Sequence, residues 1–393
     1  MLSGAPPMLV VGLVLQALWV PLAVVMRVTN TRLGLDAFAL SLVLFFVGDF
    51  MVMVGALELA RRSRGRARDG AALAVVADAI VLVIGVLATL KQGGWMPGDR
   101  HWVLDLGQWG APLAALVGIL GFAIAAGLRH ALVSLYAFVA TAVLFPIPPI
   151  SRLVAEHLVV GGDGLFVVYG LLMCGRSIAL ARLGVTIAKD AYPVTRDHVR
   201  AARGLRWTAI GAGLRASTAC AILAFVLGGG NVDSKPAMMI TALEIVAMVS
   251  MVKACWATAQ AQLDPLPRYL VHVALASAMT TLVGMVRTQM DVYTGVHDVM
   301  YVPRWVELAG TLTVGWMVVV IGLYARRART LVRPAQIWGG LFTLVACLGV
   351  AFGTSVLATM MAIASNVVVI PLFVLASREV ANDPVKTTAD VFA

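Results

Sequence analysis

The chain has 393 residues, of which 61% are hydrophobic and only 13% are charged. Soluble domains usually carry about 25% charged residues, so this composition excludes a water-soluble globular protein, and apolar runs of about 20 residues predict membrane-spanning helices. The formal net charge of +10 gathers in one alternating set of loops, which is typical of membrane orientation and argues against nucleic-acid binding.

The apolar runs predict twelve spanning helices, six in each half of an all-α polytopic membrane protein. The N-terminal run has no preceding basic residue, unlike a cleavable signal peptide, and is therefore interpreted as the first span. The first half, domain 1–195, contains the predicted spans 8–26, 36–60, 71–90, 110–128, 131–149 and 165–188. The second half, domain 196–393, contains the predicted spans 207–228, 236–260, 268–288, 305–324, 335–353 and 356–376.

The loops differ in their content of Lys and Arg. With both termini on one side, the loops and ends of that side hold 18 of these residues, and the other side holds 8. Loops rich in Lys and Arg stay in the cytoplasm. The sequence therefore predicts that both termini are cytoplasmic and that the protein lies in the inner membrane. Its predicted partner is then the lipid bilayer.

Parts of the chain recur about half a chain length apart. Gly85–Thr89 reads GVLAT and Gly284–Thr288 reads GMVRT, and each is followed by a His and a Trp with seven residues between them, His101…Trp109 and His297…Trp305. Six helices per half give both halves the same orientation, so we interpret them as parallel repeats. At an offset of 199, Asp78 then corresponds to Ser277, and Arg215 to Gln16.

Six charged side chains fall inside the predicted spans. A charge at the bilayer centre is costly, and such groups normally face a protein interior or a wet cavity, where they pair. Two readings are open: buried pairs that lock helix packing, or a substrate or ion pathway with a charged site between the halves. The six candidate residues are Asp49, Asp78, Arg176, Arg215, Glu244 and Lys253.

The remaining chemistry-bearing residues predict no cofactor and no metal. None of the six histidines lies in the middle of a span, and an outer metal site from His101, His297, Asp105 and Asp298 lacks any local ligand spacing. We expect Trp95, Trp102, Trp109, Tyr301 and Trp305 to form an interfacial aromatic belt instead. The four cysteines lie in apolar runs and are interpreted as buried packing residues.

Twelve spans, two parallel halves and a basic loop after the second span resemble the major facilitator superfamily in architecture. The loop Ala60–Arg68 reads ARRSRGRAR and lacks the Asp of that family's motif. The loops after the third and tenth spans are also longer than that family's. The resemblance therefore carries over no residue role.

These patterns favour a secondary transporter of a small molecule or ion. The alternative is a non-transporting sensor, scaffold or subunit bound to a membrane protein partner. An integral-membrane enzyme has no support, because the chain contains no nucleophile motif, metal signature or phosphate-binding loop.

Overall fold

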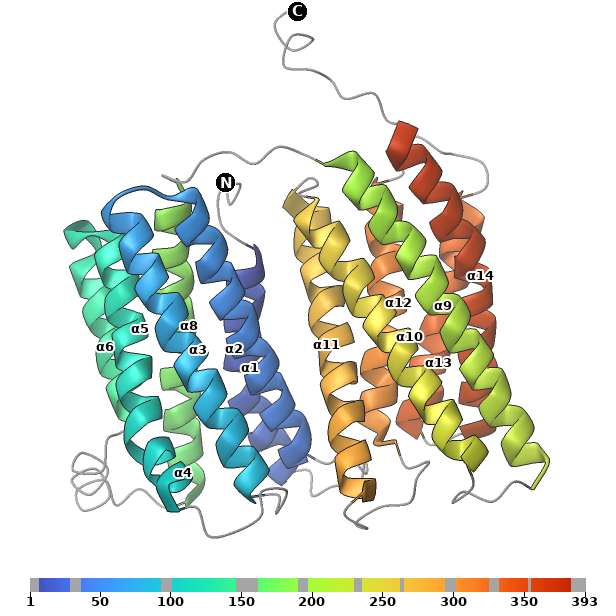
Figure 1. Ribbon diagram of the computed structural model, residues 1–393, viewed down its shortest axis with the longest axis horizontal. Helices are drawn as coiled ribbons and strands as arrows, with labels where there is room; N and C mark the ends of the chain where they lie inside the picture. Colours follow the sequence, from blue (N-terminus) through green and yellow to red (C-terminus); the bar gives the residue numbers. More distant parts are fainter. Residues whose placement is uncertain are drawn as a thin grey trace, which may run out of the picture. The chain divides into compact units, whose positions relative to one another are not determined.

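The computed structural model (Figure 1) describes residues 7–28, 37–92, 101–145, 162–189, 197–229, 235–261, 265–293, 302–324, 332–352 and 355–382, and in these residues all regular structure is helical. Each of the twelve predicted spans coincides with a helix. Among the described residues, ten helices are long and apolar enough to cross a membrane, and two shorter apolar stretches are Pro7–Leu18 and Ala131–Leu144. The predicted all-α polytopic membrane fold is confirmed.

The chain divides into two compact units, Met1–Pro193 and Val194–Ala393. The long helices of unit 1 are α1 (Pro7–Val28), α2 (Ala37–Arg62), α3 (Arg66–Gln92), α5 (Ala111–Ala126), α6 (Ala131–Leu144) and α8 (Gly162–Lys189). Short helical turns, α4 (His101–Asp105), η1 (Leu106–Gly110) and η2 (Leu128–His130), precede α5 and α6. The long helices of unit 2 are α9 (His198–Leu227), α10 (Lys235–Gln260), α11 (Pro265–Tyr293), α12 (Arg304–Tyr324), α13 (Val332–Phe352) and α14 (Ser355–Asn382).

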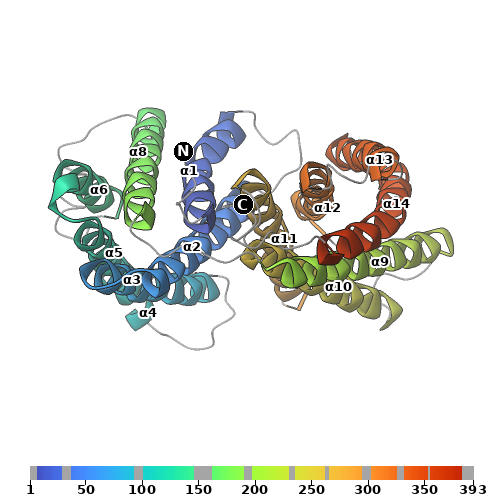
Figure 2. The ribbon, with the colours of Figure 1, turned by 90° about the horizontal axis from the view of Figure 1, so that it is seen from above.

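Each unit is a ring of helices in which every helix packs on the next one along the chain. In unit 1 the ring closes because α8 packs back on α1, and in unit 2 because α14 packs back on α9 (Figure 2). The two units therefore share one order of packing, as a duplication predicts. The corresponding tryptophans have different surroundings, since Trp109 is 45% exposed and Trp305 is 3% exposed. The internal repeat stays a prediction.

Small residues bring neighbouring helices close together. A Cβ on Gly48 of α2 would lie 2.9 Å from the carbonyl oxygen of Gly12 in α1. In unit 2, a Cβ on Gly211 of α9 would lie 2.6 Å from the Met251 sulfur of α10. Close backbone approach at small residues is how membrane helices gain van der Waals contact, because the surrounding lipid is as apolar as a leucine side chain.

The apolar core of unit 1 lies toward one end of its ring. We call this the linker end, since α8 ends there and the segment to unit 2 follows; it is the end where α1 begins and α2 ends. The core residues come from all six helices and include Leu9, Leu13, Leu59, Phe122, Leu180 and Leu183. The other end is called the far end, and the same terms apply to unit 2, where α9 begins at the linker end.

One predicted span extends several residues past the end of its helix. The prediction 131–149 continues past Leu144, where α6 ends. Phe145 is followed by Pro146, and a residue before proline is sterically disfavoured in the helical conformation. The prolines at 146, 148 and 149 lie outside the described residues.

Candidate functional site

Arg176 of α8 lies inside the ring of unit 1 and is only 8% exposed. Its Nε donates to the Thr141 hydroxyl of α6 at 2.9 Å, and its Nη1 donates to the Gln16 amide oxygen of α1 at 3.1 Å. The guanidinium carbon lies 5.8 Å from the centroid of the Phe145 ring. Three helices and one aromatic ring thus hold this cation at mid-depth.

Two carboxylates accompany Arg176. Asp49 of α2 is 7% exposed, and one of its oxygens accepts a hydrogen bond from the Gln16 side-chain nitrogen. Asp78 of α3 lies against α5, where a Cβ on Gly118 would be 3.2 Å from its Oδ1. Both carboxylates lie close enough to interact electrostatically with the Arg176 guanidinium. We call Gln16, Asp49, Asp78, Thr141 and Arg176 the unit 1 cluster.

Arg215 of α9 and Glu244 of α10 form a direct ion pair in unit 2. Arg215 Nε lies 3.1 Å from Glu244 Oε1, with the side chains 10% and 16% exposed. The other Glu244 oxygen accepts a hydrogen bond from the Thr218 hydroxyl of α9. Both oxygens of the Glu244 carboxylate therefore have a hydrogen-bond partner. Among the described residues, Asp49 and Asp78 of unit 1 each have one oxygen without such a partner.

The Arg215 guanidinium also crosses to α12. Its Nη1 donates to the Gly310 carbonyl oxygen, and a Cβ on Gly310 would lie 2.9 Å from Arg215 Nη2. Glycine at this position leaves room for the guanidinium. Glu307, exposed in the first turn of α12, interacts electrostatically with Arg215 and Glu244. We call Arg215, Thr218, Glu244, Glu307 and Gly310 the unit 2 cluster.

The two clusters share one feature. Each places a buried arginine beside acidic side chains from other helices of the same unit. In each unit the second helix supplies an acid that bonds to a side chain of the first helix, as Asp49 does to Gln16 and Glu244 does to Arg215. The internal comparison had already aligned Gln16 with Arg215.

Lys253 is the one candidate that joins neither cluster. Its side chain is exposed on α10, and its ammonium nitrogen lies 3.9 Å from the centroid of the Trp207 ring on α9. A long cationic side chain on an apolar helix can extend toward the membrane surface while its stem stays in contact with the helix. The structure thus places five of the six predicted residues in buried clusters and Lys253 on an outer face.

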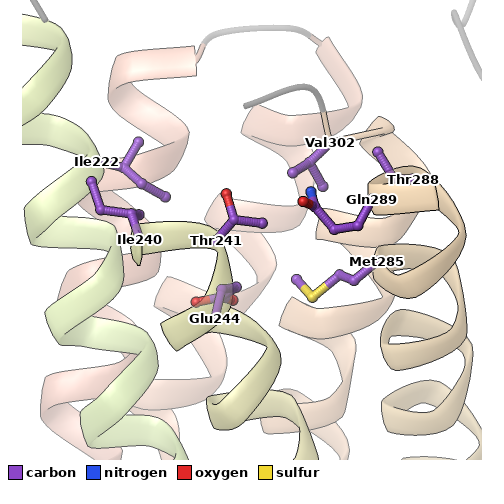
Figure 3. Close-up of a pocket in the computed structure, with 8 residues that line it drawn as sticks. All are labelled: Ile222, Ile240, Thr241, Glu244, Met285, Thr288, Gln289 and Val302. Carbon is purple, nitrogen blue, oxygen red and sulfur yellow. The ribbon is translucent and has the colours of Figure 1, made fainter. Parts of the chain in front are cut away.

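A small cavity of about 50 Å³ reaches Glu244 in unit 2 (Figure 3). Glu244 lies deepest in this view, and the polar side chains of Thr241, Thr288 and Gln289 line the cavity nearer the far end. The rest of the lining is apolar: Ile222, Ile240, Met285 and Val302. A cavity needs about 10–15 Å³ to hold one water, so this space admits several waters but no drug-sized ligand.

Sequence reasoning missed four polar members of the clusters. Gln16, Thr141 and Thr218 are uncharged, and Thr is common in membrane helices, where its hydroxyl bonds to the preceding turn, as Thr141 does to Ala137 at 2.7 Å. Glu307 lies near the start of its span, where an acid is ordinary. Only Gln16 carried a signal, as the internal counterpart of Arg215.

The other sequence predictions concern metals, cysteines and aromatic residues. Within the described ranges, no group of three or more His, Cys, Asp or Glu side chains could hold a metal ion. Cys255 and Cys347 are buried, Cys174 is half-buried, and Cys220 is exposed, which corrects the prediction for Cys220. Trp102 and Trp109 are exposed as a belt requires, but Trp305 is buried against Gly284. Trp95, His297, Asp298 and Tyr301 lie outside the described residues.

Comparison with protein-family models, with curated proteins and with solved structures found no match to this chain.

Proposed function

We propose that this multi-pass membrane protein is a secondary transporter of a small molecule or ion. The observation that carries the proposal is the pair of charged clusters, one inside each helical ring. Ionisable groups within membrane helices are costly and mark substrate paths and proton relays in transport proteins. A buried arginine beside acidic side chains of other helices occurs in both rings, which favours a repeated functional device over a single structural contact.

The route of access supports the same proposal. The unit 2 cavity extends from Glu244 toward the far end of its ring. Toward the linker end, α10, α11 and α12 contribute a small apolar core of Ala259, Val271 and Val320. A charged group with a cavity on one side and packed apolar residues on the other is consistent with one state of an alternating-access carrier. A shared site between the halves stays a prediction.

One observation favours a second candidate, a non-transporting scaffold. Glu244 is already bonded through both oxygens, to Arg215 and Thr218. A fully paired charge can act as a packing element that fixes helix positions. The two candidates differ in water access, because a scaffold needs no water at Glu244 and a transporter does.

Thiol labelling distinguishes these candidates. In a chain with the four native cysteines replaced, Thr241→Cys places a thiol in the cavity, and Val246→Cys places one on the 52% exposed outer face of the same helix. We expect Thr241→Cys to react with a membrane-impermeant reagent from the far-end side, and from the linker-end side as well when the carrier cycles. Val246→Cys, which faces lipid, reports the background. Equal, negligible labelling of both variants would favour the scaffold.

We further propose that the protein resides in the cytoplasmic membrane with its linker end in the cytoplasm. The support is the excess of Lys and Arg in the loops and termini of that side, 18 against 8. The shared packing order of the two rings supports the proposal that a six-helix unit was duplicated.

A further inference from the structure

Among the described residues of unit 1, two carboxylate oxygens are buried without a hydrogen-bond partner. They are Asp49 Oδ2 and Asp78 Oδ2, each with almost no accessible surface. Asp49 as a whole is 7% exposed, so water does not reach this oxygen freely. Buried polar atoms nearly always have a hydrogen-bond partner or a bound water or ion, so each exception needs a physical reason.

The Arg176 guanidinium does not neutralise both acids. Its two hydrogen bonds within the described residues go to Thr141 and Gln16, not to a carboxylate. Gln16 stands between the charges, since it accepts from Arg176 and donates to Asp49. Two carboxylates and one guanidinium leave an excess of one negative charge, and the two acids repel each other. Burying an uncompensated charge is costly.

Among the described residues, three helices around the cluster, α1, α5 and α6, offer no further positive charge at this depth. Helices α5 and α6 contain no Asp, Glu, Lys or Arg, and the only charged residue of α1 is Arg27 near its C-terminal end. Two uncharged titratable side chains lie nearby: Tyr136 of α6, whose hydroxyl lies against Gly175 of α8, and Cys174 of α8, whose thiol donates to the Ala17 carbonyl oxygen. With both acids ionised, the three charged side chains are one positive charge short of neutrality.

The surroundings of the cluster close it from both ends. Toward the linker end lies the apolar core of unit 1, with Leu13, Phe122 and Leu180. Toward the far end lie the rings of Phe45 and Phe145, whose centroids are 6.4 Å apart. This arrangement suits a small ion held out of contact with water.

We propose that Asp49 and Asp78 form a binding site for one monovalent cation, a proton or an alkali ion, held by their free Oδ2 atoms. The bound cation brings the net charge of the unit 1 cluster to zero. The role of this cation as a coupling ion rests on the proposed transport function. Its binding does not, because binding can be measured even if the protein transports nothing.

The test follows the thermal unfolding midpoint of the purified full-length chain in detergent. One series raises NaCl or KCl at constant ionic strength, with choline chloride as the balance, and a second lowers the pH. A ligand that binds only the folded state raises its stability, so the wild-type midpoint of this 393-residue chain should rise by roughly 3 °C at a hundredfold excess over Kd. A rise with Na⁺ or K⁺ identifies an alkali ion, and a rise only with falling pH identifies a proton.

The variant Asp49→Asn/Asp78→Asn keeps the shape of the site and removes both negative charges, so we expect the dependence to be lost. The control is Glu58→Gln on the same helix, because Glu58 already pairs with Arg62 at 3.1 Å; this variant should retain the dependence. A wild-type midpoint that depends on neither cation nor pH overturns the proposal, and so does a dependence that survives the double variant.

A second measurement needs no variant and remains decisive where the double variant does not fold. Retention of ²²Na⁺ by wild-type protein at pH 8, with loss at pH 5, supports a site where sodium ions and protons compete. No retention at pH 8, together with a midpoint that changes with neither pH nor K⁺, overturns the proposal. Transport is assayed separately in proteoliposomes. Cation binding without transport would contradict the proposed transport function and still support the binding site.

Discussion

Arg176 and Lys253 show how differently two intramembrane cations can be placed. Arg176 is 8% exposed and bonded inside its ring, whereas Lys253 is exposed and lies over Trp207. Both residues lie far from the ends of their helices, so position along the helix does not distinguish the buried cation from the exposed one. The face of the helix on which each residue lies does. Val249 and Val246, which lie one and two turns before Lys253, are 49% and 52% exposed, so they mark the outer face of α10.

Replacing Arg176 with methionine should destabilise the protein strongly. The change leaves Asp49 and Asp78 without their guanidinium and removes the donors to Gln16 and Thr141, and loss of one partner from a buried charge cluster costs about 3–5 kcal/mol. The measurement is the free energy of unfolding in mixed micelles. Neutralising one acid as well, in Arg176→Met/Asp49→Asn, should recover part of the loss.

Lys253→Met is the matched control for this prediction. It removes a cation from the same class of sequence position, but only a cation–π contact at an exposed site is lost, about 0.5–1 kcal/mol. Equal losses for the two variants would mean that the unit 1 cluster contributes no more to stability than a surface contact does.

At the scale of the helix, the close contact between α1 and α2 sets the unit 1 cluster. A Cβ on Gly48 would lie 2.9 Å from the Gly12 carbonyl oxygen and 3.0 Å from Gln16 Cγ. The same contact that packs the two backbones therefore also positions Gln16 for its bond to the neighbouring Asp49.

Gly48→Leu should push α1 away from α2 and break the Gln16–Asp49 hydrogen bond. Overpacking of this kind typically costs about 1–3 kcal/mol, which unfolding in micelles would detect. Gly340→Leu on α13 is the control, because nothing lies within 4 Å of a Cβ at that position. If Gly340→Leu lowers stability as much as Gly48→Leu does, the close approach of α1 and α2 is not the cause.

The helices were predictable and their side-chain partners were not. All twelve spans follow from apolar runs, because the length of a membrane helix is fixed by the thickness of the bilayer. Arg176 bonds to Gln16, 160 positions away, and Arg215 pairs with Glu244, 29 positions away. Such pairs depend on which helices are neighbours in the ring and on the rotation of each helix, and neither is encoded in hydropathy.

At the scale of the whole molecule, the excess of Lys and Arg at the linker end predicts orientation. Reporter fusions after Arg64, in the loop between α2 and α3, and after Gly229, in the loop between α9 and α10, lie at the linker end and the far end of their units. We expect a cytoplasmic reporter to be active at 64 and a periplasmic reporter at 229, since positive loops are retained in the cytoplasm. The reverse pattern would contradict the proposed orientation.

Two carboxylates around a single arginine also have an electrical consequence. With its cation bound, the unit 1 cluster carries no net charge, and without it the cluster carries one negative charge. The membrane potential acts only on the charged form, with about 2.3 kcal/mol per elementary charge moved across 100 mV. In such a carrier, the membrane potential would act on the step in which the cation-free form returns across the membrane. The measured current would therefore report that step of the cycle.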